Sequence, residues 1–204
     1  MRKIIAILRG VKPNEVLPIA EQIVESGITT IEVPLNSPQP MDSIELLANR
    51  LGDCVTVGAG TVLSVADVQK VKDAGGKIVV SPNCNTTVIQ ACKAAKMLSF
   101  PGVFTATECF SALEAGADGL KLFPASLLGL GGWQALKAVL PNTVQSYAVS
   151  GVGPDDFEAW LKAGISGFGL GSAIYKPGLA AEAVRYNADR IVEAYDHASL
   201  LVSS

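Results

Sequence analysis

Short runs rich in β-branched residues alternate with longer segments of helical periodicity along the whole chain of 204 residues. The alternation occurs eight times, without a linker or a change of composition between units. The predicted strands span residues 3–8, 28–35, 55–60, 77–81, 97–102, 119–124, 144–151 and 165–172. The predicted helices span residues 14–27, 41–52, 64–76, 85–96, 105–116, 131–141, 154–164 and 179–199. Because each helix returns the chain to the start of the next strand, this rhythm predicts parallel pairing.

Eight parallel units form either an open doubly wound sheet or a closed (β/α)8 barrel. An open sheet places its phosphate-binding loop after the first strand, and the residues ILRGVKP at that place do not match such a loop. The short, even period favours the barrel. We therefore expect an α/β protein in which residues 1–204 form one (β/α)8 barrel domain. Left-handed glycines are expected to end helices at Gly27, Gly52, Gly75, Gly116 and Gly164.

Net charge, hydropathy and cysteine spacing indicate which classes of partner and which compartment to expect. The net charge is −3 and no basic stripe is present, so we expect no nucleic-acid partner. No apolar stretch approaches the roughly 18 residues that span a bilayer, and we expect no membrane partner. The four cysteines lack paired spacing, which is typical of reduced structural thiols. A cytoplasmic protein is the simplest interpretation.

Three ionic residues occupy the carboxyl ends of predicted strands, where barrel enzymes place their catalytic groups. Arg9 follows the first strand, Glu32 lies between Ile31 and Val33, and Lys121 lies in the run GLKLFP. Because side chains alternate along a strand, the apolar neighbours share one face and the ionic residue takes the other. Each ionic residue taken alone fits a solvated loop charge. Together they predict a buried cluster inside the barrel, and such a cluster is paired or functional.

Glycines gather after the last two predicted strands, where barrels often bind phosphate. Gly151, Gly153, Gly169 and Gly171 would let the backbone approach a ligand closely, and Ser172 offers a hydroxyl. Glycines at these turns are also ordinary turn residues. Their position in the barrel, more than their composition, favours a phosphate site.

The cluster predicts a particular chemistry. A poorly solvated lysine near an arginine should have a lowered pKa, and a neutral amine attacks a ketone to form a Schiff base. Arg9 is suited to hold a carboxylate, and Glu32 to move a proton. His197 is the only histidine, so a histidine-rich metal site is not expected, and no metal or other cofactor is expected. The residues thus point to a Schiff-base lyase acting on a phosphorylated keto acid.

Several ordered segments extend the argument over nearly the whole chain. The segments ILRG, IEVPLNSP, GAGTVL, SPN, PG, TATE, LKLFPAS and GLGS occur in that order. In this respect the chain resembles the KDPG/KHG aldolase family, class I aldolases built on a (β/α)8 barrel. The resemblance implies cleavage of a 6-phospho-2-keto-3-deoxy sugar acid to pyruvate and glyceraldehyde 3-phosphate. It also implies a homotrimer, which composition does not show.

The resemblance assigns roles to individual residues. It implies that Lys121 forms the Schiff base and that Glu32 is the proton shuttle. It also implies that Arg9 and Thr61 contact the pyruvate carboxylate region and that Pro82 and Phe123 line the pocket. The residues implied to bind phosphate are Gly151, Gly171 and Ser172.

Two positions bear on the substrate. Family members usually carry two glycines after the seventh strand, whereas this chain has Ser150 before Gly151. A hydroxyl there adds a hydrogen bond, or crowds the backbone if φ is positive. Val149 is typical of galactonate-type relatives, whereas gluconate-type relatives tend to have threonine. We therefore expect 2-dehydro-3-deoxy-6-phospho-D-galactonate as the substrate, with the gluconate epimer, and also 4-hydroxy-2-oxoglutarate, as the alternative.

Two other functions remain open on the residues alone. One is a sugar-phosphate epimerase, whose metal-dependent forms need histidine and carboxylate ligands and whose metal-free form needs two acid–base groups. The other is a sensor that binds a phosphorylated sugar acid without turnover. A sensor has no use for an uncharged amine, so Lys121 with Arg9, Glu32 and Thr61 favours the aldolase.

Overall fold

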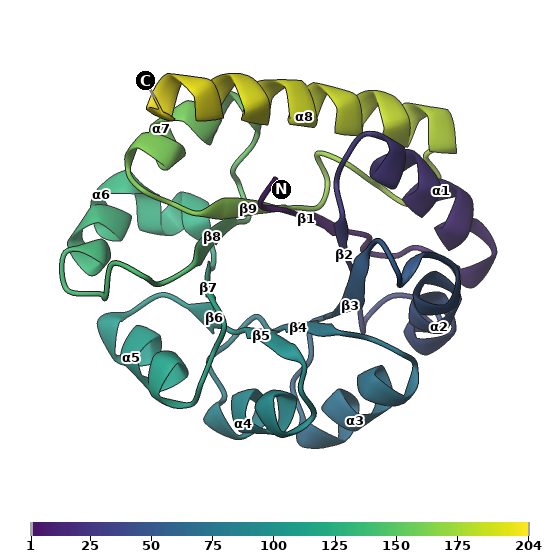
Figure 1. The fold of residues 1–204 in the computed structure, drawn as a ribbon, viewed down its shortest axis with the longest axis horizontal. Helices are drawn as coiled ribbons and strands as arrows, with labels where there is room; N and C mark the ends of the chain where they lie inside the picture. The colour runs from purple at the N-terminus through teal and green to yellow at the C-terminus, as the bar shows by residue number, and fades with distance from the viewer. Residues whose placement is uncertain (1, 204) are drawn as a thin grey trace.

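A computed structural model describes residues 2–203, which form nine parallel strands and eight α-helices around one barrel (Figure 1). The strands are β1 (Ile4–Ile7), β2 (Thr30–Pro34), β3 (Thr56–Gly60), β4 (Ile78–Val80), β5 (Leu98–Phe100), β6 (Gly102–Val103), β7 (Leu120–Leu122), β8 (Ser146–Val149) and β9 (Gly167–Leu170). The helices are α1 (Pro13–Glu25), α2 (Pro40–Leu51), α3 (Val65–Asp73), α4 (Thr86–Ala94), α5 (Ala106–Glu114), α6 (Ala125–Lys137), α7 (Phe157–Lys162) and α8 (Ala181–Ser203). A short 3₁₀ turn, η1 (Pro154–Asp156), precedes α7. The predicted (β/α)8 barrel is confirmed.

The extra strand arises because the fifth unit is divided at Pro101, which has no N–H to donate. The chain pairs with β4 through β5 and with β7 through β6. The carbonyl of Phe100 accepts a hydrogen bond from the Ser81 N–H at 3.1 Å, and that of Pro101 accepts one from the Lys121 N–H at 2.9 Å. One predicted strand thus appears as two short strands that join the two sides of the ring.

Local sequence explains where the helices begin and end. Ser64, Asn85 and Thr105 each cap a helix by accepting hydrogen bonds from backbone N–H groups in its first turn. Positive φ angles are confirmed after helices at Gly27, Gly75, Gly116 and Gly164. The prediction of a left-handed conformation at Gly52 is wrong, since its φ is −62°. The chain stays right-handed there and continues into a further turn.

Two layers of apolar side chains pack on either side of the strands. The alternation along β1 shows the rule, since Ile4 and Ala6 join the large core against the helices while Ile5 faces the inside of the barrel. The inner layer is small and consists of Ile5, Ile78, Val80 and Phe100, with Tyr147 packed against them. The interior at the carboxyl ends of the strands is therefore left for functional side chains.

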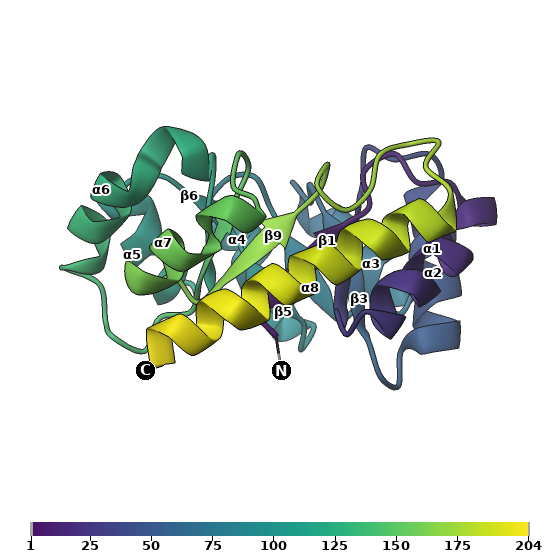
Figure 2. The same cartoon turned by 90° about the horizontal axis from the view of Figure 1, so that it is seen from above.

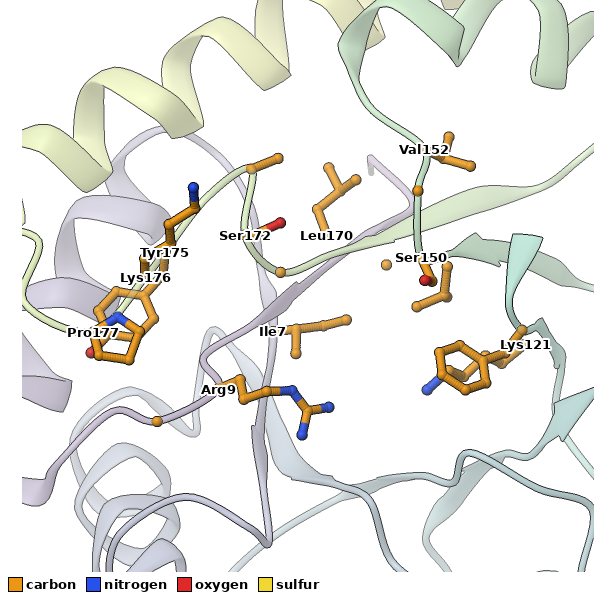
Figure 3. Close-up of a pocket in the computed structure, with 17 residues that line it drawn as sticks. Ile7, Arg9, Lys121, Ser150, Val152, Leu170, Ser172, Tyr175, Lys176 and Pro177 are labelled. Carbon is orange, nitrogen blue, oxygen red and sulfur yellow. The ribbon is translucent and has the colours of Figure 1, made fainter. Parts of the chain in front are cut away.

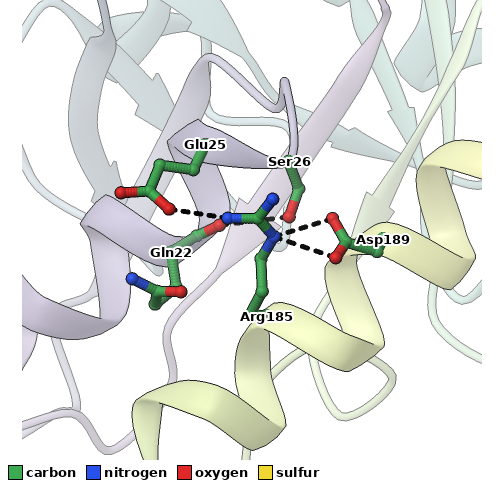
Figure 4. A network of polar contacts seen from close by, with 5 residues as sticks. All are labelled: Gln22, Glu25, Ser26, Arg185 and Asp189. Carbon is green, nitrogen blue, oxygen red and sulfur yellow. Dashed lines mark hydrogen bonds and ion pairs between the residues drawn. The ribbon is translucent and has the colours of Figure 1, made fainter.

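Helix α8 covers the place where the last strand meets the first (Figure 2). It packs against both α1 and α7. Arg185 donates to Glu25 of α1 at 2.6 Å and to Asp189 of α8 at 2.9 Å (Figure 4). Arg2 pairs with Asp196 at 2.6 Å. These half-exposed ion pairs orient α8, whereas the apolar contacts beneath it supply most of the stability.

None of the helices within residues 2–203 is both long enough and apolar enough to cross a membrane.

The aromatic cluster under α8 yields a stability prediction. Phe157 is fully buried, and its ring centroid lies 4.2 Å from that of Phe168. Truncation of Phe157 to alanine leaves a cavity, so we expect Phe157→Ala to lower the free energy of unfolding by about 3–5 kcal/mol in urea titrations. The matched control is Phe110→Ala, since Phe110 is 39% exposed and its loss should matter little. Equal losses for the two variants would contradict this account of the core.

Candidate active site

A pocket of about 640 Å³ opens at the carboxyl ends of β1, β7, β8 and β9 (Figure 3). Lys121 and Phe123 come from the end of β7, and Val149, Ser150 and Gly151 from the end of β8. Gly169 lies in β9, Gly171 and Ser172 follow that strand, and Arg9 lies in the turn after β1. Nine residues that the sequence singled out therefore line one cavity.

Lys121 lies on the inner face of β7, as strand alternation predicts. Its neighbours Leu120 and Leu122 are fully buried in the outer core, and Lys121 itself is only 6% exposed. The ammonium nitrogen lies 4.4 Å from the centroid of the Phe123 ring. Burial lowers the pKa of Lys121, and the charge of Arg9 lowers it further, while Glu32 opposes both effects. The amine is therefore easier to deprotonate than an ordinary lysine.

Glu32 is the buried carboxyl group that interacts electrostatically with Lys121 inside the barrel. It is 2% exposed on β2, between the buried side chains of Ile31 and Val33. Burial raises the pKa of Glu32 to about 7, against the opposing charges of Lys121 and Arg9. Among the described residues, its Oε2 atom has no hydrogen-bond partner. A buried carboxyl that titrates near neutrality is suited to accept and return a proton.

Sequence reasoning missed the residue that makes room for Glu32. A Cβ added to Gly60 would lie 2.0 Å from Glu32 Oε2 and 2.4 Å from its Cδ. Only glycine at the end of β3 therefore allows the carboxyl group to sit where it does. The available signal was the small-residue run GAG, which forms the end of the strand.

Arg9 corrects the expectation of three buried ionic residues. It is exposed at the mouth of the pocket, because it lies in the turn two residues beyond the end of β1. Its Nη1 atom donates to Asn36 Oδ1 at 2.6 Å, and the N–H of Gly10 donates to Ser37 Oγ at 2.9 Å. The turn after β2 therefore fixes Arg9. In Figure 3 its guanidinium points across the pocket towards Lys121.

The glycine-rich turns after the neighbouring strands β8 and β9 both line the pocket. Ser150 and Gly151 have φ angles of 78° and 70°, so the serine occupies a left-handed conformation that glycine adopts without strain. The Ser150 carbonyl accepts a hydrogen bond from the Ser126 N–H at 3.1 Å. The predicted Gly153 lies outside the pocket lining, whereas Gly169 belongs to it.

Glu32 is not among the residues that line this cavity, and two further predicted residues also lie outside the lining. Thr61, with a φ of 57°, follows β3, and Pro82 follows β4 shortly after it. Both lie at the carboxyl end of the barrel but outside the residues that line the pocket. The pocket is built on the other side of the ring, where β1, β7, β8 and β9 end.

The segment after β9 contributes residues that sequence reasoning overlooked. Ala173, Tyr175, Lys176 and Pro177 all line the pocket. The Tyr175 hydroxyl donates to Glu15 Oε1 of α1 at 2.9 Å. The sequence offered one signal, a lysine between the glycine-rich turn GLGS and the last helix. Ile7, Gly10, Val152 and Leu170 complete the lining and were also not predicted.

A parallel (β/α)8 barrel with a buried amine–carboxyl pair below a cationic pocket is the architecture of a barrel enzyme that handles an anionic substrate. The family model "KDPG and KHG aldolase" matches residues 1–191. The chain belongs to this family of aldolases, which are carbon–carbon lyases.

Curated relatives and solved structures agree with the family. Over 96% of its length the chain is 47% identical to "Probable 2-dehydro-3-deoxy-6-phosphogalactonate aldolase" of Rhizobium meliloti (strain 1021), covering 92% of that protein. It is 42% identical to "2-dehydro-3-deoxy-6-phosphogalactonate aldolase" of Escherichia coli (strain K12), again over 96% of this chain and over 95% of that protein.

Two solved structures superpose closely. "Native KDPGal structure" aligns with a TM-score of 0.95 and 42% identity, covering 97% of this chain and 96% of that one. A "cube-shaped, highly porous protein cage designed by fusing symmetric oligomeric domains" aligns with a TM-score of 0.97 and 40% identity, covering 99% of this chain and 75% of that one.

The left-handed serine leads to a prediction. The substitution Ser150→Gly relieves a strain of about 1–3 kcal/mol, partly offset by the greater freedom of glycine in the unfolded chain. We expect the free energy of unfolding to rise by about 0.5–1 kcal/mol in urea titrations. Ser111→Gly, in α5, is the control and should instead lose about 0.5 kcal/mol. A less stable Ser150→Gly protein would show that the serine hydroxyl is worth more than the strain.

Proposed function

We propose that this protein is a class I aldolase that cleaves 2-dehydro-3-deoxy-6-phospho-D-galactonate to pyruvate and D-glyceraldehyde 3-phosphate. The observation that carries the proposal is Lys121, a buried amine of lowered pKa in a pocket that Arg9 and Lys176 also line. Relatives named for the galactonate substrate, at 47% and 42% identity, favour this epimer. The gluconate epimer remains the alternative substrate, and Val149 in the pocket lining is the residue we assign to the choice.

The reaction begins at the ketone of the substrate. The neutral Lys121 amine attacks C2 to form a carbinolamine, and loss of water gives a protonated Schiff base. Glu32 hands a proton to the departing hydroxyl as water forms, and it becomes the carboxylate that the next step needs. The raised pKa of Glu32 allows it to hold the proton and to release it at neutral pH.

Carbon–carbon cleavage follows. The Glu32 carboxylate takes the proton of the C4 hydroxyl, the C3–C4 bond breaks, and its electron pair flows into the iminium to give an enamine. The C4 carbon leaves as the aldehyde of glyceraldehyde 3-phosphate. Protonation of the enamine at C3 and hydrolysis of the imine release pyruvate and return Lys121 to the free amine. The overall reaction neither oxidises nor reduces the substrate and consumes no net water.

The rest of the pocket binds and orients the substrate. We assign the binding of the substrate carboxylate to Arg9, whose guanidinium points towards Lys121 (Figure 3). The Phe123 ring lies beside the Lys121 amine and lines the pocket. The phosphate is assigned to the turns after β8 and β9. The residues of that phosphate site are Ser150, Gly151, Gly171 and Ser172. Thr61 and Pro82, which follow β3 and β4, are assigned to the pyruvate end of the substrate.

We also propose that three chains assemble. Large apolar side chains are exposed after the carboxyl ends of β3, β6 and β7. Leu63 is 51% exposed, Phe104 40% and Leu127 77%, and all three lie at the same end of the barrel. Exposed apolar side chains that share one end favour contact with another protein surface. The similarity to a domain in a cage of symmetric oligomeric domains supports the same interpretation.

Borohydride reduction in the presence of pyruvate tests the proposed mechanism. We expect a reduced pyruvyl adduct on the peptide that contains Lys121, identified by mass spectrometry, because Lys121 is the only buried lysine among residues 2–203 and its burial lowers its pKa. Lys121→Met should show neither adduct nor turnover while keeping the circular dichroism of the wild type. An adduct on another lysine, or turnover by Lys121→Met, would rule the mechanism out.

Glu32→Gln separates proton transfer from attachment of the substrate. The glutamine keeps the shape of the side chain but cannot accept the proton, so we expect kcat to fall by roughly 10²–10⁴-fold. Substrate should still bind. An unchanged rate in steady-state assays of pyruvate release would assign the shuttle to another group.

Sedimentation equilibrium tests the assembly. The wild type should have three times the mass of the 21.2 kDa chain, and Leu127→Asp should yield monomers, because a buried unpaired charge is costly. The matched control is Val139→Asp, which replaces a 59% exposed residue after α6 and should remain trimeric. A monomeric wild type, or dissociation of the control alone, would contradict the proposal.

A further inference from the structure

The charge of the pocket lining is of one sign. Arg9, Lys121 and Lys176 line the pocket, and no aspartate or glutamate does so among the described residues 2–203. The chain as a whole carries a net charge of −3, so this concentration of cations is local to the cavity. Arg9 and Lys121 already have partners in the proposed reaction, whereas Lys176 has none.

Lys176 projects from a backbone that is held in place on both sides. The hydroxyl of the preceding Tyr175 donates to Glu15 at 2.9 Å, and the Tyr175 N–H donates to the Gly171 carbonyl at 3.0 Å. The ring of the following Pro177 packs over Gly10, where an added Cβ would lie 2.7 Å from its Cγ. The backbone at Lys176 is thus fixed, although the side chain of this lysine is exposed.

The ammonium group of Lys176 is available to a ligand. Six salt bridges are found in the described part of the chain, and none includes this lysine. Figure 3 shows Lys176 at the edge of the pocket away from Lys121, on the same side as Ser172. A substrate attached to Lys121 by its ketone would extend its far end towards this edge.

We propose that Lys176 is a specificity-determining residue whose ammonium group binds the terminal phosphate and so separates phosphorylated sugar acids from unphosphorylated ones. The inference rests on the proposed function, since it concerns the far end of the same substrate. The turns after β8 and β9 orient the phosphate through backbone groups and hydroxyls, which carry no net charge. Lys176 supplies the positive charge that pairs with the phosphate, and an unphosphorylated acid has no group at that place to pair with it.

The test compares two substrates across three variants. We would measure kcat/KM for pyruvate release from the phosphorylated acid and from the same acid without phosphate, using Lys176→Met, Lys176→Arg and the wild type. Loss of one charged hydrogen bond predicts a fall of roughly 10–100-fold for Lys176→Met on the phosphorylated acid. The unphosphorylated acid should be cleaved at an unchanged rate. Lys176→Arg should retain most of the activity, because it keeps the charge.

Lys12→Met is the matched control, since Lys12 is exposed at the same end of the barrel but lies outside the pocket lining. It should discriminate between the two substrates as the wild type does. Equal losses of Lys176→Met on both substrates, no loss on either, or the same loss in the Lys12 control would overturn the proposal.

A second readout does not depend on turnover. Inorganic phosphate should bind the wild type at least about 10-fold more tightly than Lys176→Met in ³¹P NMR titrations, as expected for a charged hydrogen bond. The pyruvyl adduct on Lys121 should form equally in both proteins. If the wild type formed no adduct, the proposed function would fail, and the phosphate titration would still decide the role of Lys176. Equal phosphate binding by the two proteins would overturn that role.

Discussion

Lys121 and Glu32 are both buried inside the barrel, and the electrostatic interaction between them is the constraint that governs the chemistry of the site. Removing an ammonium and a carboxylate from water costs several kcal/mol per ion, and their attraction repays this only in part. The protein responds by shifting both groups towards their neutral forms, so that the pKa of Glu32 rises to about 7 and that of Lys121 falls. A purely structural ion pair would gain nothing from this shift. An amine that must attack a carbonyl and a carboxyl that must exchange protons both gain from it.

The barrel positions the pair with little freedom. Leu120 and Leu122 of β7 pack against the helices, as do Ile31 and Val33 of β2. The residues between them, Lys121 and Glu32, therefore point into the barrel. This is why side-chain alternation along the strands predicted the inner placement of both residues. The prediction needed only the order of residues along a strand, which is local information.

Features that depend on contacts between distant segments were not predictable in the same way. The exposure of Arg9 follows from a turn that Asn36 and Ser37 hold from the neighbouring unit. The position of Lys176 follows from Glu15 and Gly10, which lie about 160 residues earlier in the chain. The division of the fifth strand could have been inferred from Pro101, which cannot donate to a ladder. The conformation of Gly52 could not, because a glycine after a helix adopts either hand.

The space that Gly60 leaves for Glu32 has an evolutionary consequence. A side chain at position 60 would enter the volume of the carboxyl group, while loss of the carboxyl group would free that volume for a side chain. Neither position can drift alone without either a collision or a vacancy. A larger residue at position 60 would therefore force the Glu32 carboxyl group, on the adjacent strand β2, out of its present place. A glycine without any reactive atom is in this sense as much a determinant of the chemistry as the acid it accommodates.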